Sequence, residues 1–205
     1  MDGSSIVNGA SYEQLRSGFT IAKFDCANLK YLVNKLSAIN DDNNYMISVD
    51  YKSLFSFDKL IPYLNYIKYN SLKGLSNIVL SVDLSGIEPY EYTMTLSRIG
   101  YFKSLGLSIK IDKVDDRLPF SLIDSVNPDY IKISTSSWRK AMENDRKKKI
   151  LESELNLLKA YNNDLKLVFD QIEKQEESEF LKVISSDDSL FLGKYYSKER
   201  KLILK

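Results

Sequence analysis

The stretch "VNPDYIKIS", residues 126–134, predicts a short buried β-strand that ends in polar side chains. Its apolar residues alternate with polar ones, and Lys132 lies inside the run, two residues before Ser134. A lysine in such a strand requires an acidic partner or a polar cavity, because burying an unpaired ammonium group costs free energy. We therefore expect Lys132 to lie at the end of a strand that lines a site.

Strand-like runs of the same kind recur along the chain and alternate with helix-like stretches. The further predicted strands are 45–49, 77–84, 107–112, 165–170 and 190–196, and the predicted helices are 26–39, 57–69, 137–161 and 176–184. This alternation indicates an α/β protein with a mostly parallel sheet.

Two short runs near the start, 5–7 and 11–15, add strands and bring the expected number to about eight. About eight strands suggest a TIM-like (β/α)8 barrel, and barrels of this type usually need ~250 residues. The chain has 205 residues, so we expect a shortened barrel that occupies residues 1–205 as one domain.

Composition excludes several classes of site. The sequence has no histidine and a single cysteine, Cys26, which excludes histidine-based nucleophile pairs, histidine metal sites and an intrachain disulfide framework. Any metal would be held by oxygen ligands. The net charge of +1 gives no general attraction to nucleic acid or anionic membranes, and the basic run 146–149 is interpreted as a solvated helix face. We expect a cytoplasmic protein with no membrane span and no direct nucleic-acid partner.

Carboxylates follow several predicted strands at the end where a barrel places its site. They are Glu13, Asp50, Asp83, Asp112 and Asp170, with Glu173 three residues after the last. One such residue commonly caps the helix that follows its strand. Several together also fit an oxygen-ligand metal site or the remnant of one. Both interpretations are open from the residues alone.

The order of these motifs resembles the EAL domain, the bacterial phosphodiesterase fold for cyclic di-GMP. "VNPDYIKIS" is similar to Pro-Asp-x-x-Lys-Ile-Asp, with Lys132 for the active-site lysine and Ser134 for the final Asp. "IVNGASYEQLRSG" resembles the opening that leads into Glu-Ala-Leu, with Glu13 for the name-giving Glu. "LVFDQIEKQEE" looks like Ala-Glu-Gly-Val-Glu-Thr, with Asp170 and Glu173 for its two glutamates.

Further motifs complete the resemblance over nearly the whole chain. Asp50 in "ISVDYKSL" replaces a metal-binding Asn, and Asp83 in "VLSVDLSG" corresponds to a Glu. In "LGLSIKIDKVD", Asp112 matches the first Asp of an Asp-Asp pair and Lys113 replaces the second. In "FLGKYYSKE", the glycine of the closing Gln-Gly-Tyr is kept as Gly193 and Leu192 replaces the Gln.

These departures imply a domain without catalysis. The resemblance implies two-metal hydrolysis of a phosphodiester in active members. Lys113 puts an ammonium where a ligand is expected, Asp170 is one methylene shorter than Glu, and Ser134 and Leu192 remove polar groups. We expect no metal and no cofactor, with Glu13, Asp50, Asp83 and Asp112 as remnant metal positions. Remnant catalytic positions are Lys132, Asp170 and Glu173.

The resemblance leaves three functions open. The first is an inactive regulatory domain that binds another protein, such as a transcriptional regulator; the tyrosine-rich runs 61–70 and 87–94 are candidate contact surfaces. The second is a metal-independent receptor of cyclic di-GMP that would use Arg16 and Lys132. The third, least favoured, is a weak phosphodiesterase. Lys132 is expected to pair with Asp112 or another carboxylate.

Overall fold

The computed structural model describes residues 18–36, 45–70, 75–114 and 119–196. It divides into two compact units, residues 1–110 and 111–205, which are described in turn. The predicted strands 5–7 and 11–15, with Glu13 and Arg16, lie outside the described residues. Among the described helices, none combines the length and the hydrophobicity that crossing a bilayer requires.

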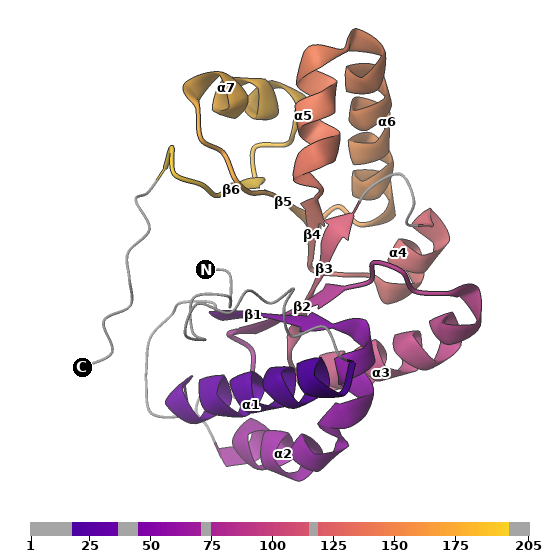
Figure 1. Cartoon of the computed structure of the whole chain (residues 1–205), viewed down its shortest axis with the longest axis vertical. Coiled ribbons are helices and arrows are strands. Elements are labelled where there is room, and N and C mark those ends of the chain that lie inside the picture. The colour runs from indigo at the N-terminus through magenta and orange to yellow at the C-terminus, as the bar shows by residue number, and fades with distance from the viewer. Residues whose placement is uncertain (1–17, 37–44, 71–74, 115–118, 197–205) are drawn as a thin grey trace. The chain divides into compact units, whose positions relative to one another are not determined.

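The first unit places helices around two paired parallel strands (Figure 1). Its elements are α1 (Gly18–Leu36), β1 (Tyr45–Asp50), the 3₁₀ helix η3 (Tyr51–Leu60), α2 (Ile61–Asn70), β2 (Ile78–Asp83), the 3₁₀ helix η4 (Pro89–Glu91) and α3 (Tyr92–Ser104). Strands β1 and β2 run parallel, with Ile47 opposite Leu80 and Asp50 opposite Asp83. Leu29, Val49 and Leu80 are fully or almost fully buried, so the core lies between α1 and these strands.

The second unit repeats the alternation of strand and helix. Its elements are the end of β3 (Ser108–Val114), α4 (Phe120–Val126), β4 (Tyr130–Ile133), α5 (Thr135–Glu143), α6 (Asp145–Tyr161), β5 (Lys166–Phe169), α7 (Gln175–Ile184) and β6 (Leu190–Phe191). Strand β5 pairs in parallel with both β4 and β6. Trp138 and Phe169 are completely buried in its core.

The strands follow one another in chain order, β1-β2-β3 in the first unit and β3-β4-β5-β6 in the second. Each lies within or close to a strand predicted from residue 45 onward, but the last, predicted over 190–196, is a strand only at Leu190–Phe191. The protein therefore has the predicted α/β fold with a parallel six-stranded sheet. Sequential parallel strands joined by helices place all strand carboxyl ends at one edge of each unit's sheet, which is where the polar residues were expected.

One predicted helix is divided in two. The range 137–161 was expected to form a single helix, but Asn144 adopts an extended conformation (φ −147°, ψ 114°) between α5 and α6. Its side-chain oxygen accepts a hydrogen bond from Lys147 N at 3.1 Å and caps α6. The two helices pack side by side (Figure 1). An asparagine inside a helical pattern is thus the point where the chain reverses.

Helices α3 and α4 were not predicted. The exposed side of α3 is rich in Thr, Ser and Gly, which weakens its helical pattern, and α4 is only seven residues long. The end of α4 has a clear cause in the sequence. Asn127 adopts the left-handed conformation (φ 45°), which Asn tolerates better than most residues, and Pro128 follows it.

Candidate functional site

The carboxyl ends of β3, β4 and β5 bring three charged side chains together in the second unit. Lys132 Nζ lies 2.7 Å from Asp112 Oδ1 and 2.9 Å from Asp170 Oδ2. The side chains of Lys132, Asp112 and Asp170 are 15%, 9% and 21% exposed. Thr135 Oγ1 donates a hydrogen bond to the other oxygen of Asp170 at 2.9 Å. The expected pairing of Lys132 with Asp112 is confirmed, and Asp170 is a second partner.

The charge of Lys132 is stabilised by this arrangement. Burial alone would lower the pKa of Lys132, but the two carboxylates outweigh burial, so its pKa is raised above the ordinary value. The lysine is therefore protonated throughout the physiological range. One ammonium faces two carboxylates, and this set does not fit a divalent cation, because the ammonium already lies within hydrogen-bond distance of both acids.

Lys113 lies next to this cluster in sequence but is exposed. Its backbone adopts φ 55°, the left-handed region that favours Gly, Asn and Asp, and its N–H donates to Asp112 Oδ1 at 3.0 Å. Lys132 is thus the lysine that makes the ion pairs with Asp112 and Asp170. The role of Lys113 as the replacement of a metal ligand stays a prediction.

The carboxyl ends of β1 and β2 carry Asp50 and Asp83, which are opposite each other in the strand register. Each aspartate accepts a hydrogen bond from the backbone two residues later. Asp50 Oδ1 accepts from Lys52 N at 2.8 Å, and Asp83 Oδ1 accepts from Ser85 N at 2.9 Å as well as from the Ser85 hydroxyl. These contacts are those of turn and helix caps, one of the two interpretations that the sequence left open.

Two buried helix carboxylates, missed from the sequence, hold the junction of β1 with η3 and the loop that follows β5. In the first unit, Asp25 Oδ2 of α1 accepts from Asp50 N at 3.1 Å and from Ser53 Oγ at 2.6 Å. Asp25 is completely buried. An acid placed between the apolar residues Ala22 and Leu29 of one helix face was the available indication.

In the second unit, Glu177 of α7 accepts hydrogen bonds from the backbone of the loop after β5. Glu177 Oε2 accepts from Glu173 N at 2.7 Å and Lys174 N at 3.2 Å, and Oε1 accepts from Arg139 Nε at 3.1 Å. Burial raises the pKa of Glu177, but the two backbone N–H groups and Arg139 outweigh burial, so its pKa lies below the ordinary value. Arg139 Nη2 also donates to Gln171 O at 2.9 Å. The side chain of Glu173, a predicted remnant position, is exposed.

Steric constraints require a glycine at position 193. Gly193 adopts φ 151°, and a Cβ there would lie 2.2 Å from Ile172 O and 2.4 Å from Ile172 N. Ile172 N donates to Leu192 O, and Tyr195 N donates to Ile172 O, so this segment is tied to the loop after β5. The Leu192 side chain is 48% exposed, and Ser134 Oγ lies 2.9 Å from Ser136 Oγ.

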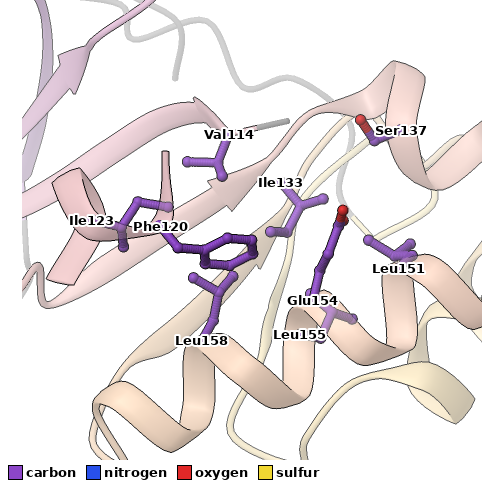
Figure 2. A pocket seen from close by; sticks show the side chains of 9 residues that line it. All are labelled: Val114, Phe120, Ile123, Ile133, Ser137, Leu151, Glu154, Leu155 and Leu158. Atoms are coloured by element: carbon purple, nitrogen blue, oxygen red, sulfur yellow. The ribbon is translucent and has the colours of Figure 1, made fainter. Parts of the chain in front are cut away.

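A small hollow in the second unit lies apart from the ionic cluster. Phe120 and Ile123 of α4, with Leu155 and Leu158 of α6, form much of its wall (Figure 2). Its polar lining residues are Ser137 and Glu154, and its lining includes none of Asp112, Lys132 or Asp170. Over the described residues, no three His, Cys, Asp or Glu side chains are grouped so that they could hold a metal ion.

The fold is that of EAL domains. The structure is similar to the Xanthomonas citri FimX EAL domain in complex with c-diGMP, with a TM-score of 0.78, 8% identity, and coverage of 97% of this chain and 80% of that one. It is similar to the Bacillus subtilis YkuI protein, which has an EAL domain and was solved in complex with substrate c-di-GMP and calcium. That match has a TM-score of 0.69, 17% identity, and coverage of 92% of this chain and 45% of YkuI.

A third similar structure is an EAL domain protein from Listeria monocytogenes EGD-e, with a TM-score of 0.65, 18% identity, and coverage of 90% of this chain and 70% of that one. The chain thus spans 45% of the length of YkuI, 70% of the Listeria protein and 80% of the FimX domain. Neither a protein-family model nor a curated protein matches the sequence. At these identities the similarity establishes the fold, and function has to be argued from the side chains.

Proposed function

We propose that this chain is a cytoplasmic EAL-like domain that does not hydrolyse cyclic di-GMP and regulates another protein, such as a transcriptional regulator, by binding it. The proposal is carried by Lys113 and the shorter Asp170, which replace expected site residues, and is supported by the ion pairs of Lys132 with Asp112 and Asp170. Metal-dependent hydrolysis needs carboxylates that are available to cations. Here the single ammonium of Lys132 lies within hydrogen-bond distance of both carboxylates and offsets part of their charge, which favours a structural use of this site.

Exposed aromatic residues support a protein partner. Tyr66 and Tyr69 of α2 are 62% and 76% exposed, and Tyr90 of η4 is 81% exposed. Tyrosine is enriched in protein interfaces, where its ring buries apolar area and its hydroxyl makes hydrogen bonds. The predicted tyrosine-rich runs therefore include side chains that a partner can reach.

The second candidate is a metal-independent receptor of cyclic di-GMP. It is favoured by the similarity to the FimX EAL domain, which was solved in complex with c-diGMP. Phosphate groups require cationic or N–H donors. Lys132 is already engaged by two carboxylates, and Arg16 lies outside the described residues, so this candidate has weaker support. A weak phosphodiesterase is the third.

Calorimetric titration of the chain with cyclic di-GMP, in buffer alone and with magnesium or manganese, separates these candidates. We expect no binding heat under any of these conditions. Heat without metal would replace our proposal by the receptor. Heat that requires a metal, together with appearance of the linear dinucleotide, would replace it by the phosphodiesterase.

A further inference from the structure

The exposed face of α6 is uncharged and largely apolar from Ile150 onward. From Ile150 to the end of the helix its exposed residues are all uncharged: Ile150, Ser153, Asn156, Leu157, Ala160 and Tyr161. Ile150, Leu157 and Tyr161 are 48%, 41% and 48% exposed. A solvent-facing helix normally carries charges on its outer side. We call these six residues the α6 face.

The charged residues of this part of α6 are turned elsewhere. Lys159 Nζ pairs with Asp188 at 3.0 Å, and Glu152 lies 4.0 Å from Lys148 Nζ. Glu154 lines the hollow beside α4 (Figure 2). The buried row of the helix is formed by Leu151, Leu155 and Leu158. The α6 face is therefore a second apolar row, separate from the one that packs on the unit's own core.

The spacing of the α6 face suits packing against another helix. Ile150, Ser153, Leu157 and Ala160 follow intervals of three, four and three residues, which is the spacing of a coiled-coil seam. Small residues alternate with large ones, so a partner's side chains can enter beside Ser153 and Ala160 while Ile150 and Leu157 project. From Ile150 to Tyr161 the seam is about 17 Å long at 1.5 Å per residue.

Positive charge is concentrated at one end of this seam. Arg146, Lys147 and Lys149 occupy the first turns of α6 and are exposed, with Asp145 as their acidic neighbour. Lys148 differs, because it lies near Glu152 and its Nζ is 5.8 Å from the centre of the Phe180 ring. The surface thus has a basic end and an uncharged remainder.

We propose that the α6 face docks an α-helix of the regulated partner, one with an apolar seam and a cluster of acidic residues at the end that lies beside Arg146, Lys147 and Lys149. This inference rests on the proposed function and names the surface that would carry it. Charge complementarity favours the acidic helix over a second copy of this chain. A parallel copy of α6 would place two basic ends together, and an antiparallel copy would place each basic end beside an uncharged one. The apolar seam supplies the affinity and the basic end supplies the orientation.

The test uses the full chain and two fluorescein-labelled helical peptides of about three heptads. Both peptides have the same leucine seam; one carries four glutamates at one end and the other carries four lysines there. We expect the glutamate peptide to bind at least about tenfold more tightly by fluorescence anisotropy, with the difference shrinking as salt is added. Leu157→Glu should weaken its binding at least about twentyfold, as expected for truncating a central apolar contact.

Two further variants complete the design. Arg146→Glu with Lys149→Glu should reverse the preference between the peptides, and Val183→Glu, at a residue of α7 that is 76% exposed, should leave binding unchanged. Circular dichroism confirms that each variant is folded. The proposal would be overturned if the glutamate peptide did not bind or if both peptides bound equally well. It would also be overturned if Val183→Glu weakened binding as much as Leu157→Glu does.

Analytical ultracentrifugation of the chain alone tests whether a second copy of the chain binds to the α6 face instead. Self-association that Leu157→Glu abolishes would overturn the proposal in favour of an interface between copies. The titration with cyclic di-GMP does not involve Leu157, so hydrolysis there would refute the proposed function while the peptide results separately decide whether the α6 face binds a helix.

Discussion

The strand ends of the two units use their acidic residues in different ways. In the first unit, Asp50 and Asp83 each close the turn that follows their own strand. In the second unit, Asp112 and Asp170 come from different strands and share one ammonium, that of Lys132. Acidic residues at comparable sequence positions are thus local caps in one unit and members of a long-range ionic cluster in the other.

The difference between the two units follows from Lys132, which pairs with the carboxylates of the second unit. The side chains of Asp112 and Asp170 are 9% and 21% exposed, so they repel each other strongly unless a cation lies between them. Lys132 is that cation. Asp50 and Asp83 are half-buried and are stabilised by hydrogen bonds to nearby N–H groups. Their removal should therefore have a smaller effect.

The largest expected effect follows from removing the lysine. Lys132→Met should lower the free energy of unfolding by about 3 kcal/mol, because it leaves two neighbouring carboxylates without their cation. Urea unfolding followed by circular dichroism measures the change. Adding Asp112→Asn and Asp170→Asn to Lys132→Met should recover much of the loss, since the repulsion is then gone. Lys140→Met, at an exposed lysine of α5, is the matched control.

A Lys132→Met protein as stable as the parent would show that the ionic cluster contributes little, and the contrast between the units would then disappear. A loss of the same size in Lys140→Met would point to a general charge effect instead of a local one.

The glycine beside the loop after β5 should have the next largest effect. Gly193→Ala should cost at least about 2 kcal/mol of unfolding free energy, because the added Cβ meets the Ile172 backbone and φ is unfavourable for alanine. Gly100→Ala is the control in the first unit, since it lies within α3 and its Cβ would meet nothing within 4 Å. Thermal unfolding compares them, and an unchanged melting temperature in Gly193→Ala would mean that Ile172 moves aside easily.

Much of this architecture could be predicted from the sequence. The six strands from residue 45 onward were predicted because runs of apolar residues bounded by polar ones persist whatever their neighbours are. The pairing of Lys132 with Asp112 followed from the cost of burying a lone lysine. The caps at Asp50 and Asp83 remained one of two interpretations, because a cap and a metal ligand require the same residue at the same position.

Other features depend on contacts that local patterns do not contain. Asp25 accepts the backbone N–H of Asp50, 25 residues away, which no local pattern contains. The contact of Glu177 with Glu173 N spans 4 residues and is a helix-capping contact that the sequence analysis missed. The exposure of Ile150 depends on which side of α6 meets the core. The sequence pattern joined α6 to α5 in one predicted helix, because it did not reveal the interruption at Asn144. The contributions of Glu13 and Arg16 stay predictions, since both lie outside the described residues.

A cap in the first unit should give a modest effect. Asp83→Ala should lower the unfolding free energy by about 1 kcal/mol, the usual cost of losing a side-chain cap. Asp83→Asn keeps an oxygen acceptor and should lose less than half of that. Urea unfolding distinguishes the two variants. If Asp83→Ala costs as much as Lys132→Met, Asp83 has a role beyond closing its turn.

The smallest expected effect concerns Lys113. Lys113→Gly should raise the unfolding free energy by about 0.5–1 kcal/mol, because glycine adopts φ 55° without the steric cost that lysine bears. Thermal unfolding measures the gain, and Lys174→Gly, at an exposed residue with negative φ, should show none. A clear loss in Lys113→Gly would instead support the metal-substituting role predicted for the Lys113 side chain.

The central claim is that Lys113, the shorter Asp170 and the ion pairs of Lys132 with Asp112 and Asp170 leave the chain unable to cleave cyclic di-GMP. The most direct measurement incubates the purified chain with cyclic di-GMP and manganese and separates linear from cyclic nucleotide by chromatography. The account predicts no linear product above a blank without protein. Metal-dependent formation of linear product that Asp112→Asn abolishes would contradict it.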